Sequence, residues 1–293
     1  MRRLFPVTDM TAAGPPAPHG TAAPHAPASA APDTTAAPDT TAASHTPGSA
    51  ASDREWSLDE LADAYAYPAE AAFGPWLRAN MVSSLDGAGQ HDGRSQPLSS
   101  EADMRIFGTL RALADVVVVG AETVRLEGYR PARAREAFAA RRAAAGQGPA
   151  PVIAVVTASL DLDFSLPLFT EPLVPTLVLT GAASSPERRA EAERAGAEVM
   201  IAGDGPGVEP ERAVAALAER GLRRQLTEGG PRLLGQFVAA GVLDELCLTV
   251  SPTMTAGGAQ RIAGGPSVDV PKRFAVASVL EQDGFLFTRY RRI

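Results

Sequence analysis

Short apolar runs alternate with amphipathic stretches along the chain from Trp56 to the C-terminus. Apolar runs rich in β-branched residues indicate buried strands, whereas apolar residues at the helical period indicate helices that pack on one face. The runs predict strands over residues 76–83, 116–120, 152–157, 176–180, 198–201, 222–226, 245–251, 274–281 and 285–291. The amphipathic stretches predict helices over 100–113, 123–127, 186–195, 210–219 and 231–240. Strands that alternate with helices are typical of an α/β fold with a parallel sheet.

The last two predicted strands follow one another without a helix between them. Gln282, Asp283 and Gly284 join them, and an Asp-Gly pair at such a junction is typical of a β-hairpin turn. We therefore expect antiparallel strands to close the parallel sheet. The Ala- and Arg-rich residues 132–149 indicate a solvated helix and loop.

The N-terminal part of the chain has a different composition. Residues 11–52 consist almost entirely of Ala, Pro, Thr, Ser, Gly and His, with an APDTTAA repeat and no aromatic residue. Such a segment buries too little apolar surface to offset the entropy lost on ordering. We expect residues 1–55 to be a disordered extension, in which residues 2–7 could still dock as a short strand, and residues 56–293 to form one folded domain.

Overall composition narrows the class of protein. The chain has 293 residues, of which 45% are hydrophobic, and a formal net charge of −7. A mildly acidic chain lacks the basic surface that nucleic-acid binding needs. No apolar run approaches the roughly 20 residues that span a bilayer, and no long apolar segment of a signal peptide follows the first residues. We expect a soluble, cytoplasmic protein.

The chain has too few cysteine and histidine residues for a disulfide, for a metal site built on them or for a serine triad. The one cysteine, Cys247, lies in the apolar run ELCLTV and is expected in the core. Three histidines, His19, His25 and His45, lie in the N-terminal segment, and His91 lies in a polar, Gly-rich stretch typical of a loop. The sequence therefore predicts no metal site, no disulfide and no serine triad.

The segment TEGGPRLLGQF, residues 227–237, joins a predicted strand to a predicted helix. Gly229 and Gly230 allow a sharp turn and a close backbone approach, and Pro231 suits the first helical turn. Unpaired N–H groups at a helix start bind phosphate groups, and Glu228 at the strand end would face a substrate. The segment predicts a nucleotide site, although an ordinary strand-to-helix turn explains it equally well.

Two further strand ends carry small or polar residues. NMVSSLDG, residues 80–87, brings Asp86 into a polar turn, which a simple cap also explains. VVVVGAETVRLEGYRPAR, residues 116–133, places Gly120, Ala121 and Thr123 at a second helix start. Open α/β sheets bind ligands at the carboxyl ends of their strands, so these residues are candidates for part of a dinucleotide site.

Three arginines flank the second of these strand ends. Arg111, Arg130 and Arg133 are candidates for holding a phosphate group through charge-assisted hydrogen bonds, although most arginines in the chain must simply be solvated. Neither a Rossmann GxGxxG fingerprint after a strand nor a GxxxxGKS phosphate loop is present. The sequence therefore argues against a conventional dehydrogenase and against a P-loop nucleotide hydrolase.

Five ordered motifs resemble the reductase domain of bacterial riboflavin biosynthesis. They are SLDG at 84–87, GRS at 93–95, VVVVGAETVRLEGYRPAR at 116–133, VTASL at 156–160 and LTEGGPRLLGQFVAAGVLDELCLTVSP at 226–252. The resemblance covers roughly residues 56–293. It implies a dihydrofolate-reductase-like, three-layer α/β/α fold with a mostly parallel central sheet and a C-terminal antiparallel hairpin. The chain resembles the stand-alone reductase, because the HxE and PCxxC motifs of a zinc deaminase half are absent.

The resemblance implies which residues form the site. It implies NADPH contacts from Val82, Thr123, Glu127, Ser159, Gly230, Pro231, Arg232, Leu233 and Leu234, and the turns described above add Gly120, Ala121 and Gly229 to the expected cofactor site. It implies substrate contacts from Ser95, Arg111, Arg133 and Glu228. Glu228 and Asp86 are the candidates for relaying a proton.

The implied reaction is the NADPH-dependent reduction of 5-amino-6-(5-phosphoribosylamino)uracil to its ribitylamino product, with hydride delivered to the C1′ imine of the ring-opened sugar.

Two residues depart from the family pattern on the substrate side. Asn80 stands where the bifunctional members usually have lysine, and Pro97 stands where many have tryptophan. The true acceptor and the preference for NADPH over NADH stay open, and a 2′-phosphate site can be placed only loosely, near residues 180–185.

Two other functions remain as alternatives. A dihydrofolate or other pterin reductase could use the same fold, and would need no arginine for a substrate phosphate. A non-catalytic nucleotide-binding protein could also retain it, although both cofactor loops and the acid between them are present together. Open sheet edges and the resemblance together favour a homodimer.

Overall fold

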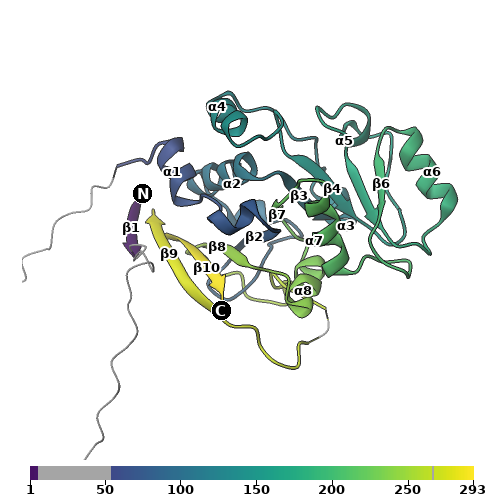
Figure 1. The fold of residues 1–293 in the computed structure, drawn as a ribbon. Coiled ribbons are helices and arrows are strands. Elements are labelled where there is room, and N and C mark those ends of the chain that lie inside the picture. The colour runs from purple at the N-terminus through teal and green to yellow at the C-terminus, as the bar shows by residue number, and fades with distance from the viewer. Residues whose placement is uncertain (6–53, 266) are drawn as a thin grey trace, which may run out of the picture.

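The computed structural model describes residues 1–5, 54–265 and 267–293, whose fold is shown in Figure 1. In this part of the chain, a ten-stranded sheet has the order β1-β9-β10-β8-β2-β7-β3-β4-β5-β6. The strands are β1 Arg2–Phe5, β2 Trp76–Ser83, β3 Val116–Gly120, β4 Val152–Val156, β5 Leu177–Thr180, β6 Glu198–Ile201, β7 Arg224–Thr227, β8 Glu245–Val250, β9 Phe274–Gln282 and β10 Phe285–Arg292. The run from β8 to β6 is parallel, whereas β10, β9 and β1 are antiparallel to their neighbours. The predicted parallel sheet with a C-terminal hairpin is confirmed.

Helices cover both faces of this sheet and complete three layers. They are α1 Leu58–Ala64, α2 Glu101–Leu113, α3 Ala121–Leu126, α4 Glu136–Ala144, α5 Pro167–Thr170, α6 Pro186–Arg194, α7 Pro210–Glu219 and α8 Pro231–Ala240, with 3₁₀ turns η2 Ala69–Ala72 and η3 Gln96–Leu98. Side chains of α1 to α6 pack with one face of the sheet in a first core cluster. Those of α7 and α8 pack with the opposite face in a second cluster. Alternating side chains of the strands feed the two clusters, as a doubly covered sheet requires.

Local chemistry sets where the helices begin and end. Pro186, Pro210 and Pro231 occupy the first turns of α6, α7 and α8, where a missing N–H has no consequence. Ser100 lies just outside α2 and accepts a hydrogen bond from the backbone N–H of Asp103, so it is a cap rather than a helical residue. Gly221, with φ of +82°, ends the turn after α7, and β7 therefore starts later than predicted.

The N-terminus belongs to the folded sheet. Strand β1 pairs with β9, with Arg2 opposite Glu281, and the two side chains form an ion pair at 2.6 Å. Figure 1 shows β1 beside β9 at one end of the molecule, far from β6. The extension expected over residues 1–55 lies mostly outside the described residues. Residues Arg2–Phe5 form strand β1 of the sheet, within the range 2–7 in which the sequence allowed a docked strand.

Helix α4 is less exposed than its composition indicates. The prediction of a solvated segment over residues 132–149 is wrong for Phe138 and Arg142, which are 1% and 3% exposed. The guanidinium of Arg142 donates to the carbonyls of Ala112 and Ala114 at 2.9 and 2.8 Å. These carbonyls lie at the end of α2, where cations are favourable, and the apolar stem of Arg142 fills the core.

A buried ion cluster joins three strands beneath α1. Glu245 on β8 is fully buried and pairs with Arg289 on β10 at 2.5 Å and with Arg78 on β2 at 2.9 Å. Arg78 also donates to the carbonyl of Tyr65 at 2.7 Å. Burial raises the pKa of Glu245, but the two guanidinium groups outweigh it and the net shift is downward.

The single cysteine lies in the same region of the core. Cys247 is 3% exposed, and burial raises the pKa of its thiol to about 12. A buried thiol in this environment stays protonated and unreactive. The prediction of a core residue is confirmed.

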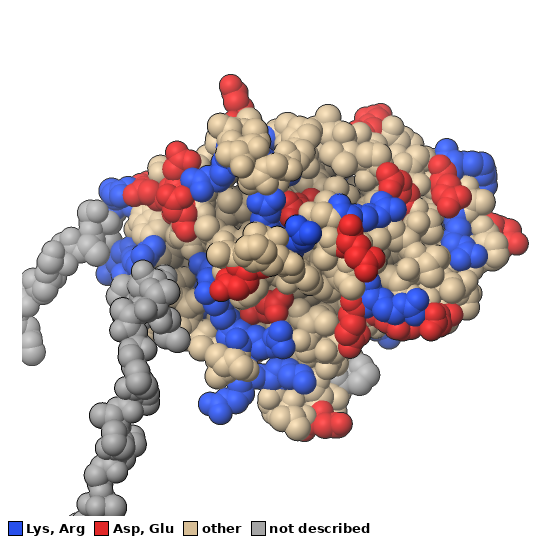
Figure 2. All heavy atoms as spheres, in the orientation of Figure 1, with Lys and Arg blue, Asp and Glu red and all other residues tan. Residues whose placement is uncertain are grey.

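The outer surface carries both signs of charge. Figure 2 shows acidic and basic side chains distributed over the visible face. None of the helices among the described residues has the length and apolar character needed to cross a membrane.

Replacing Glu245 by Gln is expected to lower the free energy of unfolding by about 3–5 kcal/mol, because two buried guanidinium groups lose their counter-charge. Urea unfolding followed by circular dichroism measures the change. Glu198→Gln is the matched control, since Glu198 is 49% exposed and pairs with Arg220 on the surface. This control should cost less than about 1 kcal/mol. Equal costs for both variants would show that the buried cluster contributes nothing special.

Candidate active site

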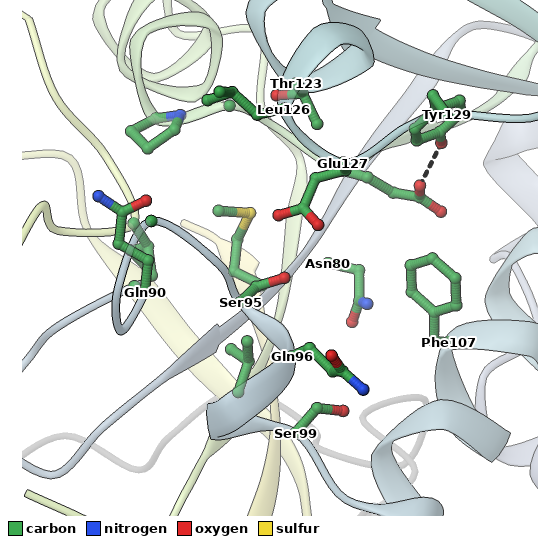
Figure 3. A pocket seen from close by; sticks show the side chains of 18 of the residues that line it. Asn80, Gln90, Ser95, Gln96, Ser99, Phe107, Thr123, Leu126, Glu127 and Tyr129 are labelled. Carbon is green, nitrogen blue, oxygen red and sulfur yellow. Dashed lines mark hydrogen bonds between the residues drawn. The ribbon is translucent and has the colours of Figure 1, made fainter.

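A cavity of about 500 Å³ opens at the carboxyl ends of β2, β7 and β3, in the middle of the sheet. Residues of β2, α2 and α3 line it, together with the loops that follow β2, α3, β7 and β8. Figure 3 shows Asn80, Gln96 and Ser99 facing the same space as Glu127 and Tyr129. Open α/β sheets bind ligands at this position, so the cavity is the candidate active site.

Two glycine turns meet on one wall of the cavity. The N–H of Gly120, before α3, donates to the carbonyl of Gly229, after β7, at 2.9 Å. Gly229 has φ of +89°, which favours glycine, and a Cβ on Gly230 would lie only 2.9 Å from Oγ1 of Thr123. No side chain caps the first turn of α8 at this point. Its backbone N–H groups are therefore free to bind a phosphate group.

A second wall carries a charged cluster between α2 and β7. Arg111 of α2 holds both carboxylate oxygens of Glu228, through Nε and Nη2 at 2.6 Å each. The hydroxyl of Tyr129 hydrogen-bonds the same carboxylate, as the dashed line in Figure 3 marks. The Glu228 side chain is only 6% exposed. Its orientation is therefore fixed from two sides before any ligand binds.

Aromatic rings enclose the arginine of this cluster. The guanidinium of Arg111 lies 4.5 Å from the ring centre of Phe107 and 5.0 Å from that of Tyr129. Both contacts are favourable cation–π geometries. Burial, followed by the nearby Glu228 carboxylate, raises the pKa of Tyr129 well above its usual value. The Tyr129 hydroxyl therefore keeps its proton and acts as a donor.

A third polar group lies on α2, one turn before Phe107. Asp103 lines the cavity and is 6% exposed. Its Oδ2 accepts from the Ser99 hydroxyl and its Oδ1 accepts from the Thr249 hydroxyl of β8, both at 2.6 Å. Burial raises the pKa of Asp103, and the two hydroxyl hydrogen bonds lower it in part. The cavity thus contains two buried acids, Glu228 and Asp103.

The structure brings together only some of the residues that the sequence nominates. Those that line the cavity are Val82, Ser95, Arg111, Thr123, Glu127, Arg130, Glu228, Gly230 and Pro231. Gly120, Ala121 and Gly229 form the two turns behind this lining. These predicted cofactor and substrate residues therefore meet at one place, from five separate segments of the chain.

Asp86 is not among the residues that line the cavity. Its carboxylate accepts hydrogen bonds from the Ser84 hydroxyl at 2.5 Å and from the backbone N–H groups of Thr255 and Ala256 at 3.2 and 2.7 Å. These hydrogen bonds, that of Ser84 first, lower the pKa of Asp86 to about 2. The structure gives Asp86 a tethering role between the loops after β2 and β8.

Five other nominated residues also lie outside the lining. Arg133 and Arg232 are exposed, as is Ser159, whose hydroxyl accepts from the N–H of Asp161. Leu233 and Leu234 of α8 are buried in the second core cluster. Only their backbone is available to a ligand near the start of α8.

Sequence analysis missed several residues of the site. Asp103, Phe107, Tyr129, Gln260 and Ile262 line the cavity without having been nominated. Tyr129 lies inside a quoted motif, so its position beside Arg130 was a usable signal. Asp103 gave none, because an acid in the first turn of a helix is ordinary. Among the described residues, no group of three His, Cys, Asp or Glu side chains is arranged to hold a metal ion.

Comparisons with known proteins agree with this geometry. The model of the RibD C-terminal domain matches residues 75–283. The chain is 28% identical to a 2,5-diamino-6-ribosylamino-4(3H)-pyrimidinone 5′-phosphate reductase from Archaeoglobus fulgidus, over 62% of this chain and 83% of that protein. It is 30% identical to the reductase of the same name from Aquifex aeolicus, over 55% of this chain and 66% of that protein.

Solved structures give the same picture of the fold. A pyrimidine reductase-like protein from Corynebacterium diphtheriae superposes with a TM-score of 0.70 and 28% identity, over 80% of this chain and 98% of that one. The deaminase/reductase from Thermotoga maritima superposes with a TM-score of 0.56 and 21% identity, over 75% of this chain and 57% of that one. The expected three-layer reductase fold is confirmed.

Replacing Arg111 by Met is expected to lower the melting temperature by about 5–8 °C, because the buried Glu228 carboxylate loses its bidentate partner. Differential scanning calorimetry measures the shift. Arg125→Met is the control, since Arg125 and its partner Asp161 are 45% and 80% exposed. That variant should shift the melting temperature by less than about 2 °C. A comparable shift in the two variants would exclude a special role for the Arg111–Glu228 pair.

Proposed function

This chain belongs to the RibD C-terminal domain family, and we propose that it uses NADPH to reduce the sugar of a 6-ribosylamino-pyrimidine 5′-phosphate in riboflavin biosynthesis. The observation that carries the proposal is the meeting of two glycine turns with a buried, fixed carboxylate in one cavity. The curated relatives are named as reductases of a compound of this class. The base is either the uracil expected from sequence or the 2-amino pyrimidinone of those names.

The residues present fit a dinucleotide cofactor. The uncapped first turn of α8 suits its pyrophosphate, and the lack of space for a Cβ at Gly230 lets this turn pack closely against Thr123 of α3. Thr123 of α3 and Glu127, directly after α3, line the cavity beside this turn and complete the proposed contacts. When bound, NADPH supplies the hydride. The preference for NADPH over NADH follows from family membership and is part of the proposal.

The chemistry adds a hydride to C1′ of the ring-opened imine and a proton to its nitrogen, so that a C=N bond becomes C–N. Glu228 is the cavity acid that Arg111 and Tyr129 hold in place, and we assign it the binding of a sugar hydroxyl. The Tyr129 hydroxyl keeps its proton and donates a hydrogen bond to the Glu228 carboxylate, so Tyr129 positions that group, and the proton for the imine nitrogen comes from water. This arrangement orients C1′ and shields it from bulk solvent.

The substrate phosphate belongs at the rim of the cavity. Arg111 is committed to Glu228 and is enclosed by aromatic rings, so it is a poor phosphate ligand. Arg130 also lines the cavity, and it is exposed. We therefore assign the phosphate contact to Arg130, with Arg133 nearby in sequence as a second cation.

We also propose a cytoplasmic homodimer. Leu4, Phe5 and Val276, at the antiparallel end of the sheet, are 49%, 50% and 43% exposed. Large apolar side chains along one sheet edge favour association with a second copy.

NADPH oxidation, followed by nicotinamide absorbance, tests the proposed function. The 2-amino and the uracil forms of the ribosylamino-pyrimidine phosphate, and dihydrofolate, are supplied separately, and NADH replaces NADPH in a parallel series. We expect turnover with a ribosylamino-pyrimidine phosphate and little with dihydrofolate, which offers no phosphate. Turnover with dihydrofolate alone would assign the protein to pterin reduction. No turnover with any of the three would favour the binding-protein alternative.

Glu228→Gln tests the role of the carboxylate. We expect kcat/KM to fall about 100-fold, because the amide binds the sugar hydroxyl less strongly and loses its charge-assisted pairing with Arg111. The Kd for NADPH should change by no more than about threefold, which isothermal titration calorimetry measures. Unchanged turnover would refute the assignment, and an equal loss of cofactor affinity would indicate general damage to the site. Glu101→Gln, at an exposed acid on the first turn of α2 that does not line the cavity, controls for the loss of a surface charge.

A further inference from the structure

The carboxylate of Asp103 has no part in the reduction described above. It lines the cavity from the first turn of α2 and is 6% exposed. Burial of a carboxylate is unfavourable unless hydrogen-bond donors surround it. The donors that the protein provides to this carboxylate therefore show how many hydrogen bonds are left for a ligand to donate.

Two hydroxyl groups fix the orientation of Asp103. Ser99 donates to Oδ2 and Thr249 donates to Oδ1, at 2.6 Å each. Each oxygen retains a further lone pair, since a carboxylate accepts about four hydrogen bonds. In the described part of the chain, no basic side chain pairs with this carboxylate. Asp103 therefore lines the cavity with hydrogen-bond acceptor capacity to spare and without a counter-charge.

The neighbouring lining can hold a flat heterocycle. Phe107 follows Asp103 by one helical turn and offers an aromatic surface. Asn80 of β2 faces the same space as Gln96 and Ser99 in Figure 3. The Asn80 side chain has both a hydrogen-bond donor and an acceptor, so it can bind a ring edge that carries one of each. The Asp103 carboxylate can only accept, so it binds ring edges that carry donors.

The two candidate substrates differ at the edge that such a carboxylate would contact. A 2-amino pyrimidinone presents an exocyclic NH₂ beside a ring N–H, two donors that match the two oxygens of a carboxylate. A uracil presents a carbonyl oxygen at C2, which places an acceptor against an acceptor. A site built to bind one hydrogen-bonding pattern rejects the other strongly, because buried polar groups are left unpaired.

We propose that Asp103 selects the 2-amino form of the pyrimidine, so that this chain acts before the C2 amine is removed. The inference rests on the proposed reductase function and specifies the base on which it acts. The product then still carries its C2 amine. A hydrolytic deamination must therefore consume it, with water adding at C2 and ammonia leaving.

A role confined to structure is the competing explanation. The hydrogen bond from Thr249 to Asp103 also ties α2 to β8. A purely structural carboxylate would affect the stability of the fold, but it would not change the ratio of kcat/KM for two substrates that differ only at C2. That ratio therefore separates the two explanations.

The test measures kcat/KM for the 2-amino and uracil forms with wild-type protein and with Asp103→Asn. We expect the wild type to prefer the 2-amino form by at least about tenfold. In Asp103→Asn, an amide N–H₂ can donate to the C2 carbonyl, so the preference should fall by about ten- to a hundredfold, mainly through KM. Glu101→Gln is the matched control, because Glu101 is an exposed acid of the same helical turn that does not line this cavity. It should leave the ratio unchanged.

A second variant guards against misfolding of the first. Thr249→Val keeps the carboxylate but removes one hydroxyl that orients it, and it should lower the preference a few-fold. A wild-type preference for the uracil form, or an unchanged ratio in Asp103→Asn, would overturn the inference while leaving the reductase function intact. Turnover of neither compound would instead contradict the proposed function. Calorimetric binding of the two compounds without cofactor then decides whether Asp103 distinguishes them.

Discussion

The bidentate pair between Arg111 and Glu228 joins helix α2 to the end of strand β7, and the cavity takes its shape from that junction. Glu228 is followed at once by the glycine turn that starts α8, whereas Arg111 lies on the helix that carries Asp103 and Phe107. One ion pair therefore sets the distance between the proposed cofactor wall and the proposed base-binding wall. Because such a pair is strongly directional, a displacement of either element disturbs both walls together.

The fold was largely predictable because the central strands are buried on both faces and appear in the sequence as apolar runs. The run VVVV of β3 is one example, and its residues alternate between the two core clusters. Helix α1 was missed, although Ser57 and Glu60 form a capping box that the sequence displays. Helix α4 was taken as solvated because an arginine in a helix is usually exposed. Only the packing shows that Arg142 lies against the carbonyls at the end of α2.

The parts of the site that the backbone forms, namely its turns and helix starts, were predictable from the sequence. The turns at Gly120 and Gly230 follow from strand ends and glycine positions, and the structure places them together. Side-chain pairings over long sequence separations were not predictable. Arg111 was a candidate for a substrate or phosphate contact, and the sequence does not reveal that it also forms an ion pair with Glu228. Asp86 was a candidate because its motif adjoins the site, but it does not line the cavity, and it accepts hydrogen bonds from Ser84 and from the loop after β8.

The lone cysteine makes the centre of the sheet observable. Cys247 lies on β8, between β2 and β10, beside the buried Glu245. The sequence contains no other thiol. A thiol reagent can therefore modify the chain only in molecules in which the first core cluster has opened around Cys247. The rate of that modification reports how often this part of the core opens, in the otherwise unaltered protein and without an introduced label.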